Sequence, residues 1–321
     1  MIELKSFAKI NLGLEILGKR PDGYHNLKTV FQAIDLFDTL QVTENSTGEI
    51  HLTGDDTSIQ WNEQNTIRRT LDAVYKKYII RQGFNITVKK QIPPGSGLGG
   101  GSSNAAVMLL FLNDHFKLNL TLEELIDIGM KIGADVPFFL VGGTALAEGI
   151  GEKLTPLEDI EEKQVDIVIP TVNVSTRLIF SQFNLTTKPI NSTIDTFVKS
   201  KNYTVLENHL ETVTFKLVPQ VEAIKANMKQ MAYDLVLMSG SGSAVYGVHG
   251  MDGLYGSTGK QEPGAALHPL KTRFPNSRVI VSRTIGRKKY FNRIGASPSG
   301  KASVFGADTT EVRILPPQHY L

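Results

Sequence analysis

The sequence of 321 residues contains no cysteine. This absence excludes disulfide bonds, thiolate catalysis and cysteine-ligated zinc or iron–sulfur centres, so a metal would need oxygen or histidine ligands. Long apolar runs are missing too. None approaches the roughly 18 residues of a membrane-spanning helix, and the first residues include an acidic side chain and no apolar signal segment. We therefore expect a cytoplasmic protein that does not enter a membrane.

A dominant charge of one sign is also missing. With 34 Lys and Arg against 32 Asp and Glu, the formal net charge is only +2. No overall field attracts nucleic acid or an anionic membrane, so any anion site must be local. Hydrophobic residues make up 41% of the chain, enough to fill two cores at this length. The expected partners are small molecules, and the expected assembly is a monomer or a homodimer.

Glycine is abundant, and the segment 93–106 contains five glycines and three serines. The alternating pattern over 84–88 predicts a strand before this segment, and the apolar run 105–116 predicts a helix after it. Glycines at such a junction let backbone N–H groups approach an anion closely, and the start of the helix adds to the attraction. The hydroxyls of Ser102 and Ser103 could reach a phosphate or a magnesium ion.

Two common phosphate-binding motifs fail to describe this segment. A Walker A motif needs a lysine before the hydroxyl, but Gly101 precedes Ser102. A Rossmann fingerprint needs a short amino-terminal strand–helix unit, which is missing. A flexible linker is the structural alternative, yet a linker has no use for the entry Pro93-Pro94 or for serines at a helix start. The segment therefore predicts a loop that cradles a polyphosphate.

Lys9 and Asp135 are candidates for chemistry outside the glycine segment. Apolar residues fall on even positions over 2–17, which predicts a long strand whose one solvent-facing side carries Lys9 and Asn11. Asp135 follows a predicted helix that begins with a capping box and ends at Gly133. Ordinary explanations remain open, because the lysine could be a solvated charge and the aspartate could form a turn or cap the next helix.

Tyr24 and His25 directly follow the strong turn sequence Pro-Asp-Gly. They could form an aromatic lid on the core and a surface histidine. Alternatively, the phenol ring could stack on a planar heterocycle while the imidazole or nearby backbone hydrogen-bonds its edge. Further along, Asn65 is expected to cap a helix. Gly240 and Gly242 lie between two predicted strands, where a hairpin needs glycine.

Together these elements resemble the GHMP kinase superfamily. Its phosphate-loop element P-x-x-x-G-L-G-G-G-S-S-x-A-A is similar to residues 93–106, and its catalytic-aspartate element is similar to the sequence G-A-D-V-P-F at 133–138. The sequence R-P-D-G-Y-H at 20–25 resembles the element with which the 4-diphosphocytidyl-2-C-methyl-D-erythritol kinases of this superfamily hold cytosine. The resemblance covers roughly residues 1–285.

This resemblance implies an α+β fold of two domains. A domain like the second domain of ribosomal protein S5 would occupy residues 1–160 and carry the phosphate loop, and a ferredoxin-like α/β domain would occupy 161–285. The segments 265–274 and 278–285 would supply the last helix and strand. Residues 286–321 have no counterpart and are expected to form a tail of unknown role.

The implied reaction is Mg²⁺- and ATP-dependent phosphorylation of the 2-hydroxyl of 4-diphosphocytidyl-2-C-methyl-D-erythritol, a step of the methylerythritol phosphate route to isoprenoid precursors. The resemblance gives Asp135 as the base and Lys9 as its partner, and assigns no metal ligands. Phe180 would face Tyr24 across the cytosine. The alternatives are another GHMP small-molecule kinase and an inactive nucleotide-binding sensor on the same fold.

The remaining implied site residues fall into two groups. Substrate would contact Asn11, Tyr24, His25, Thr176 and Phe180. ATP would contact Asn65, Pro93, Pro94, Gly95, Ser96, Gly97, Leu98, Gly99, Gly100, Gly101, Ser102, Ser103, Gly240 and Gly242.

Overall fold

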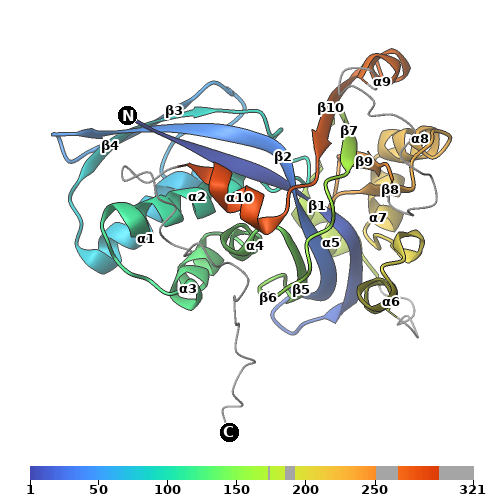
Figure 1. Cartoon of the computed structure of the whole chain (residues 1–321), viewed down its shortest axis with the longest axis horizontal. Helices are drawn as coiled ribbons and strands as arrows, with labels where there is room; N and C mark the ends of the chain where they lie inside the picture. Colours follow the sequence, from blue (N-terminus) through green and yellow to red (C-terminus); the bar gives the residue numbers. More distant parts are fainter. Residues whose placement is uncertain (173, 185–191, 251–266, 296–321) are drawn as a thin grey trace, which may run out of the picture.

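Two β-sheets, the first of them with two very long strands, organise the chain in the computed structural model, which describes residues 1–172, 174–184, 192–250 and 267–295 (Figure 1). The first sheet has the order β3-β4-β2-β5-β6, with β1 also paired to β2. Its strands are β1 (Ile2–Lys19), β2 (His25–Asn45), β3 (Ile50–Gly54), β4 (Gly83–Lys89), β5 (Thr144–Gly149) and β6 (Lys153–Pro156). The second sheet has the order β10-β7-β9-β8. Its strands are β7 (Gln164–Pro170), β8 (Leu235–Met238), β9 (Val245–Val248) and β10 (Ser277–Arg283).

Helices cover both sheets. The first core is shared by α1 (Thr66–Tyr78), α2 (Gly100–His115), α3 (Leu122–Ile132), α4 (Val136–Val141) and α10 (Arg287–Ile294). The remaining helices are α5 (Thr176–Gln182), α6 (Thr193–Ser200), the 3₁₀-helix η1 (Tyr203–Val205), α7 (Glu211–Leu217), α8 (Pro219–Met228) and α9 (Leu267–Arg273). None of the helices in the described part of the chain is long and apolar enough to span a bilayer. The mixed α+β architecture predicted from the sequence is confirmed.

Strand β1 passes through all three hydrophobic cores. Phe7 packs in the first core with helices α1–α4, Ile10 in the second, and Ile16 in the third with α7 and α8. The predicted length of this strand is confirmed, but its residues 6–16 are all buried, so the prediction of one solvent-facing side is wrong. Lys9 and Asn11 are only 3% and 2% exposed. The glycine segment lies along this strand, where the backbone N–H of Lys9 donates to Leu98 O at 3.0 Å, and it covers the Lys9 side chain, since a Cβ added at Gly99 would lie 3.2 Å from Lys9 Cγ.

Local capping signals place several helices where the sequence predicts them. Asn65 caps α1 by accepting a hydrogen bond from the Ile67 N–H. Thr121 and Glu124 form the expected capping box at the start of α3. Helix α2 begins at Gly100, five residues before the predicted start at 105, because the glycine run supplies its first turn.

The carboxyl-terminal part of the described chain corrects the predicted tail. Residues 287–294 form α10, which packs on the first core (Figure 1). The Tyr290 ring is fully buried and its hydroxyl donates to Phe139 O at 2.8 Å, while Arg293 pairs with Asp35 at 2.6 Å. Residues 286–295 are therefore part of the folded body, because an apolar stripe on α10 has a complementary surface on α4 and β1. Residues 296–321 lie outside the described part, as do 265 and 266 of the expected last helix; the boundary near 160 stays a prediction.

Candidate active site

The glycine segment forms a tight turn that ends as the first turn of α2. Gly95, Gly97 and Gly99 have positive φ angles of 67°, 81° and 75°, which glycine adopts without a steric penalty. Gly99 is the N-cap and carries no side chain to cap the helix, so the first N–H groups of α2 are left for another acceptor. Gly100 and Gly101 are helical rather than positive in φ. Positive φ is thus confined to the turn before the helix.

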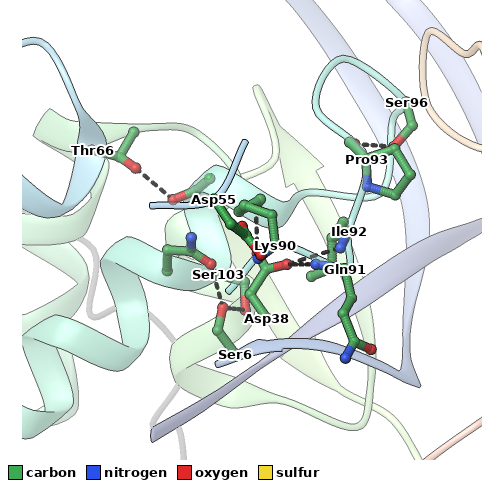
Figure 2. A network of polar contacts seen from close by, with 12 residues as sticks. Ser6, Asp38, Asp55, Thr66, Lys90, Gln91, Ile92, Pro93, Ser96 and Ser103 are labelled. Atoms are coloured by element: carbon green, nitrogen blue, oxygen red, sulfur yellow. Dashed lines mark hydrogen bonds and ion pairs between the residues drawn. The ribbon is translucent and has the colours of Figure 1, made fainter. Parts of the chain in front are cut away.

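A buried carboxylate anchors the entry to this turn. Asp38 on β2 is fully buried, and its Oδ1 accepts hydrogen bonds from the backbone N–H groups of Gln91 and Ile92, each at 2.8 Å (Figure 2). Its Oδ2 pairs with the ammonium group of Lys90. Burial raises the pKa of the Asp38 carboxyl, and the Lys90 charge opposes that shift. The pair holds the chain in place immediately before the glycines.

The same network anchors the exit of the turn. Ser6 on β1 donates to Ser103 Oγ at 2.7 Å (Figure 2). With its amide nitrogen turned toward the network, Asn104 donates to Asp38 Oδ2 at 2.9 Å and to Gly100 O at 2.8 Å. Both ends of the glycine turn are therefore fixed to the first sheet. The sequence motifs do not identify Ser6 and Asp38. Their one indication in the sequence is that they are polar or charged residues inside largely apolar strands.

Two serine hydroxyls of the predicted phosphate loop are already occupied. Ser103 is fully buried under the loop in the Ser6 network. Ser96 is 2% exposed, and its hydroxyl donates to Pro93 O at 2.7 Å. The expectation that the Ser103 hydroxyl reaches a phosphate or metal is therefore corrected, because it holds the loop instead. Ser102 is half-buried beside Gly133, with its Oγ 3.4 Å from the position of an added Cβ there.

Lys9 and Asp135 come together although 126 residues separate them in the chain. Lys9 Nζ lies 3.7 Å from Asp135 Oδ2 and donates to Asn11 Oδ1 at 2.8 Å. Asp135 occupies the N-cap position of α4, yet its side chain makes no capping hydrogen bond. Burial lowers the pKa of Lys9, and the neighbouring Asp135 carboxylate opposes that shift. The geometry favours an ion pair over a solvated lysine and a helix cap.

The second glycine turn closes over this ion pair. Gly240 and Gly242 have positive φ angles of 57° and 88°. A Cβ added at Gly240 would lie 3.6 Å from Lys9 Nζ and 3.4 Å from Asn11 Oδ1. The turn also contacts the first glycine segment, because Ser239 Oγ donates to Gly97 O at 3.0 Å. The two glycine turns and the lysine therefore line one site.

An aromatic group lies on the other side of the second turn. The His25 ring is buried and lies 5.6 Å from the Phe180 ring and 6.4 Å from the Phe183 ring. Thr176, at the start of α5, shares a hydrogen bond of 2.8 Å with Ser241 Oγ. Burial, with a smaller contribution from the nearby Lys19 charge, lowers the pKa of His25 and favours the neutral imidazole. A neutral imidazole can both donate and accept a hydrogen bond.

The burial of Tyr24 and His25 is the reverse of the alternative in which Tyr24 covers the core and His25 lies on the surface. Tyr24 is 61% exposed, whereas His25 is 7% exposed, so the lid on the core is the histidine and the surface residue is the tyrosine. The ring that contacts Phe180 directly is His25, and the expected facing of Phe180 and Tyr24 across the cytosine stays a prediction. The Tyr24 side chain is open to solvent, and its stacking on a ligand stays a prediction.

Asn65 is fully explained by its structural role. Its Oδ1 accepts from Ile67 N at 3.0 Å, and its Nδ2 donates to Gln60 O at 3.1 Å. The neighbouring Thr66 contacts the loop instead, donating to Gly101 O at 2.8 Å (Figure 2). A contact between Asn65 and ATP stays a prediction.

Comparisons with known proteins place this geometry in a family. The model of the GHMP kinases N terminal domain matches residues 65–143, which include the glycine turn and Asp135. A 4-diphosphocytidyl-2-C-methyl-D-erythritol kinase of Alkaliphilus metalliredigens is 39% identical over 255 residues, covering 77% of this chain and 88% of that protein. One from Exiguobacterium sibiricum is 42% identical over 252 residues, covering 76% of this chain and 88% of that protein. This chain belongs to the 4-diphosphocytidyl-2-C-methyl-D-erythritol kinases.

Solved structures agree with this membership. A crystal structure of 4-(cytidine 5'-diphospho)-2C-methyl-D-erythritol kinase has a TM-score of 0.74 and 30% identity, covering 89% of this chain and 100% of that one. Homoserine kinase from Cytophaga hutchinsonii shares the fold, with a TM-score of 0.67 and 18% identity over 90% of this chain and 96% of that one. The predicted two-domain GHMP kinase fold and an ATP-dependent kinase activity are thereby confirmed.

Gly101 offers a test of the phosphate loop that separates ligand binding from folding. Gly101 has helical backbone geometry, and a Cβ added there would have a Thr66 atom at 3.7 Å as its nearest neighbour. Gly101→Ala should therefore keep or slightly raise the melting temperature, since Ala is favoured over Gly in a helix. If phosphates pack on this turn, the methyl group should weaken ATP binding by about tenfold or more, because overpacking typically costs about 1–3 kcal/mol.

Calorimetric ATP titration and thermal unfolding would measure the two effects. Gly18→Ala is the matched control, because a Cβ there meets nothing within 4 Å. Unchanged ATP affinity in Gly101→Ala would show that the phosphates do not approach this turn.

Proposed function

We propose that the chain transfers the γ-phosphoryl group of ATP to the 2-hydroxyl of 4-diphosphocytidyl-2-C-methyl-D-erythritol. The observation that carries the proposal is the Lys9–Asp135 ion pair between two glycine turns, with the His25–Phe180 aromatic group beside the second turn. Phosphoryl transfer asks a protein mainly for positioning and for neutralising charge on phosphoryl oxygens, and these groups supply both. The proposal places the step in the route to isoprenoid precursors.

Asp135 and Lys9 divide the chemistry between them. The Asp135 carboxylate is 36% exposed and so is open to an incoming alcohol, from which it takes the proton. The buried Lys9 ammonium lies 3.7 Å from that carboxylate and faces the charge that develops on the transferred group. Asn11 lies on the same strand face, where its Oδ1 accepts from Lys9 Nζ and its Nδ2 donates to Thr29 Oγ1, each at 2.8 Å, and its remaining N–H is the group that a substrate could contact.

The glycine turn and α2 start would hold the triphosphate through backbone N–H groups. Within the described residues, no group of three or more acidic or histidine side chains could hold a metal ion. A Mg²⁺ ion would then be carried mainly by phosphates and water, and the half-buried Ser102 hydroxyl and the Asp135 carboxylate are the oxygen donors that the chain could add. Bound there, the ion would neutralise charge on the phosphoryl oxygens.

The alternatives are weaker. Another GHMP kinase would have no use for a pyrimidine-directed R-P-D-G-Y-H element, and a sensor would not need an intact base and lysine. Incubation with Mg-ATP and the cytidine-linked alcohol should yield ADP and a phosphorylated product. Equal turnover of the uridine analogue, or a preference for mevalonate or homoserine, would leave only the superfamily in place. Cytoplasmic location and a monomeric or homodimeric state remain predictions from the sequence.

Tyr24→Ala tests the cytosine site. Stacking on an aromatic side chain contributes about 1–3 kcal/mol per base, equivalent to roughly 5- to 150-fold in affinity. The variant should raise the KM for the cytidine substrate by that factor and leave the KM for ATP unchanged, because the exposed phenol supports no core packing. Tyr78→Ala, a tyrosine on the far helix α1, is the control. An unchanged KM for the cytidine substrate would place the base elsewhere.

A further inference from the structure

The second glycine turn, residues 239–242, forms a wall of the catalytic centre through its backbone. Gly240 approaches both Lys9 Nζ and Asn11 Oδ1, with 3.6 Å and 3.4 Å to the position of an added Cβ. Gly240 has a φ of 57° and no side chain, so its backbone itself faces these two atoms. A displacement of this turn by about 1 Å would therefore change the placement of Lys9 relative to the transferred group, and such errors can cost about 100-fold in rate.

One buried amide donates to the Gly240 carbonyl of this turn and to the carbonyl at the end of the strand before it. Asn208 Nδ2 donates to Met238 O and to Gly240 O, each at 2.8 Å, and its Oδ1 accepts from Leu210 N at 3.0 Å. The side chain is 3% exposed. Both donors and the acceptor of the amide are thus used, and only the amides of Asn and the longer Gln offer two donors and an acceptor in this planar arrangement.

The segment around Asn208 is attached to the strand that carries Lys9. Leu14 N donates to Glu207 O at 2.8 Å, and His209 N donates to Leu14 O at 2.8 Å. Leu14 lies on β1, five residues after Lys9. Asn208 therefore bridges the catalytic strand and the turn that faces it, and it sets the distance between them.

We propose that Asn208 is a positioning residue for phosphoryl transfer, acting through Gly240 on Lys9 and Asn11. The proposal rests on the proposed function of the Lys9–Asp135 pair. Asn208 is buried behind the turn and acts through its backbone carbonyls. Other anchors of the turn do not involve it, because Thr214 Oγ1 donates to Ser241 O at 3.1 Å. Loss of the amide donors should thus release Gly240 while the rest of the turn stays.

The experiment compares Asn208→Asp, Gly240→Ala and the double variant. The carboxylate introduced by Asn208→Asp still accepts from Leu210 N but cannot donate to Met238 O and Gly240 O. Gly240 should therefore move away from residue 208. Each single variant should lower kcat by about 10- to 100-fold, and Asn208→Asp, which touches no ligand, should leave both KM values within about threefold. Because both substitutions act on one contact, the kcat of the double variant should be about that of the less active single variant. Independent effects would instead multiply the two losses in kcat.

Asn113→Asp is the matched control. Asn113 is similarly buried, at 5% exposed, and accepts from Leu120 N at 2.9 Å near the far end of α2. It should lower the melting temperature and leave kcat unchanged. If Asn208→Asp does not fold, Asn208→Ser retains one hydroxyl donor and should show a smaller kcat loss with the same unchanged KM values.

Three results would overturn the positioning role. They are a wild-type kcat in the folded Asn208 variants, a kcat loss that matches only the unfolded fraction, and multiplicative losses in the double variant. The wild-type chain separates this outcome from failure of the proposed function. If the wild type forms no phosphorylated cytidine product, the substrate is wrong; if it does and the Asn208 variants equal it, only the positioning role is wrong.

Discussion

Asp135→Ala is expected to lower turnover by about 10²–10⁴, the usual contribution of a positioned general base. The carboxylate lies 3.7 Å from Lys9 Nζ and makes no hydrogen bond to the start of α4. The substitution leaves the buried Lys9 ammonium without its carboxylate, so the melting temperature should fall, while ATP affinity should stay near its original value. Steady-state kinetics, ATP titration and thermal unfolding would measure these three quantities.

Thr121→Ala provides the contrast for this prediction. Thr121 is a true cap that accepts from Glu124 N, so its loss should cost about 1 kcal/mol of stability and leave turnover unchanged. If Asp135→Ala behaved like Thr121→Ala, with reduced stability and normal turnover, Asp135 would be a turn residue and the base would have to be another group.

Lys9→Met is expected to lower kcat by about 10²–10³, the range found when one electrostatic contact to a transition state is removed. The loss should appear in kcat more than in the KM for ATP, because the charge is needed as the phosphoryl group moves. Stability should not fall in parallel, since removing a buried ammonium relieves its desolvation and the exposed part of Asp135 can be hydrated.

The pH dependence of Lys9 gives a second readout of the same variant. Burial lowers the pKa of Lys9 below its ordinary value of 10.5. The wild-type kcat should therefore fall at alkaline pH below 10.5, as the ammonium loses its proton. The unfolded chain binds more protons in that window, so wild-type stability gains a contribution as pH rises through the folded pKa toward 10.5. Lys9→Met should lose both effects. A basic limb identical in the two proteins would assign it to another group.

Much of the site was readable from local sequence. The glycine run, the capping box at Thr121 and the turn before Tyr24 depend on residues a few positions apart, and each determines its backbone shape wherever it is placed. The pairing of Lys9 and Asp135 was implied only by resemblance, because nothing in a local pattern brings a strand residue to a helix start 126 positions later.

Burial was decided by the tertiary structure. Alternation along β1 showed that Lys9, Asn11 and Glu15 share a side, but a period of two cannot say what covers that side. Here the glycine segment and α6 cover it, and Glu15 accepts from Thr193 N and Ile194 N at the start of that helix. The side of β1 that was predicted to face solvent is therefore buried. Burial disfavours the charged ammonium, which is why the pKa of Lys9 is lowered.

The sequence by itself determined the family, the loop and the order of the elements, because these follow from short-range backbone chemistry and from motifs. Only the tertiary structure decided which hydroxyl is free, which of Tyr24 and His25 is buried, and that Asp38 and Asn208 hold the two glycine turns. These depend on contacts between segments far apart in the chain. In such a contact, the role of a side chain depends on which hydrogen-bond donors and acceptors the distant segment places beside it.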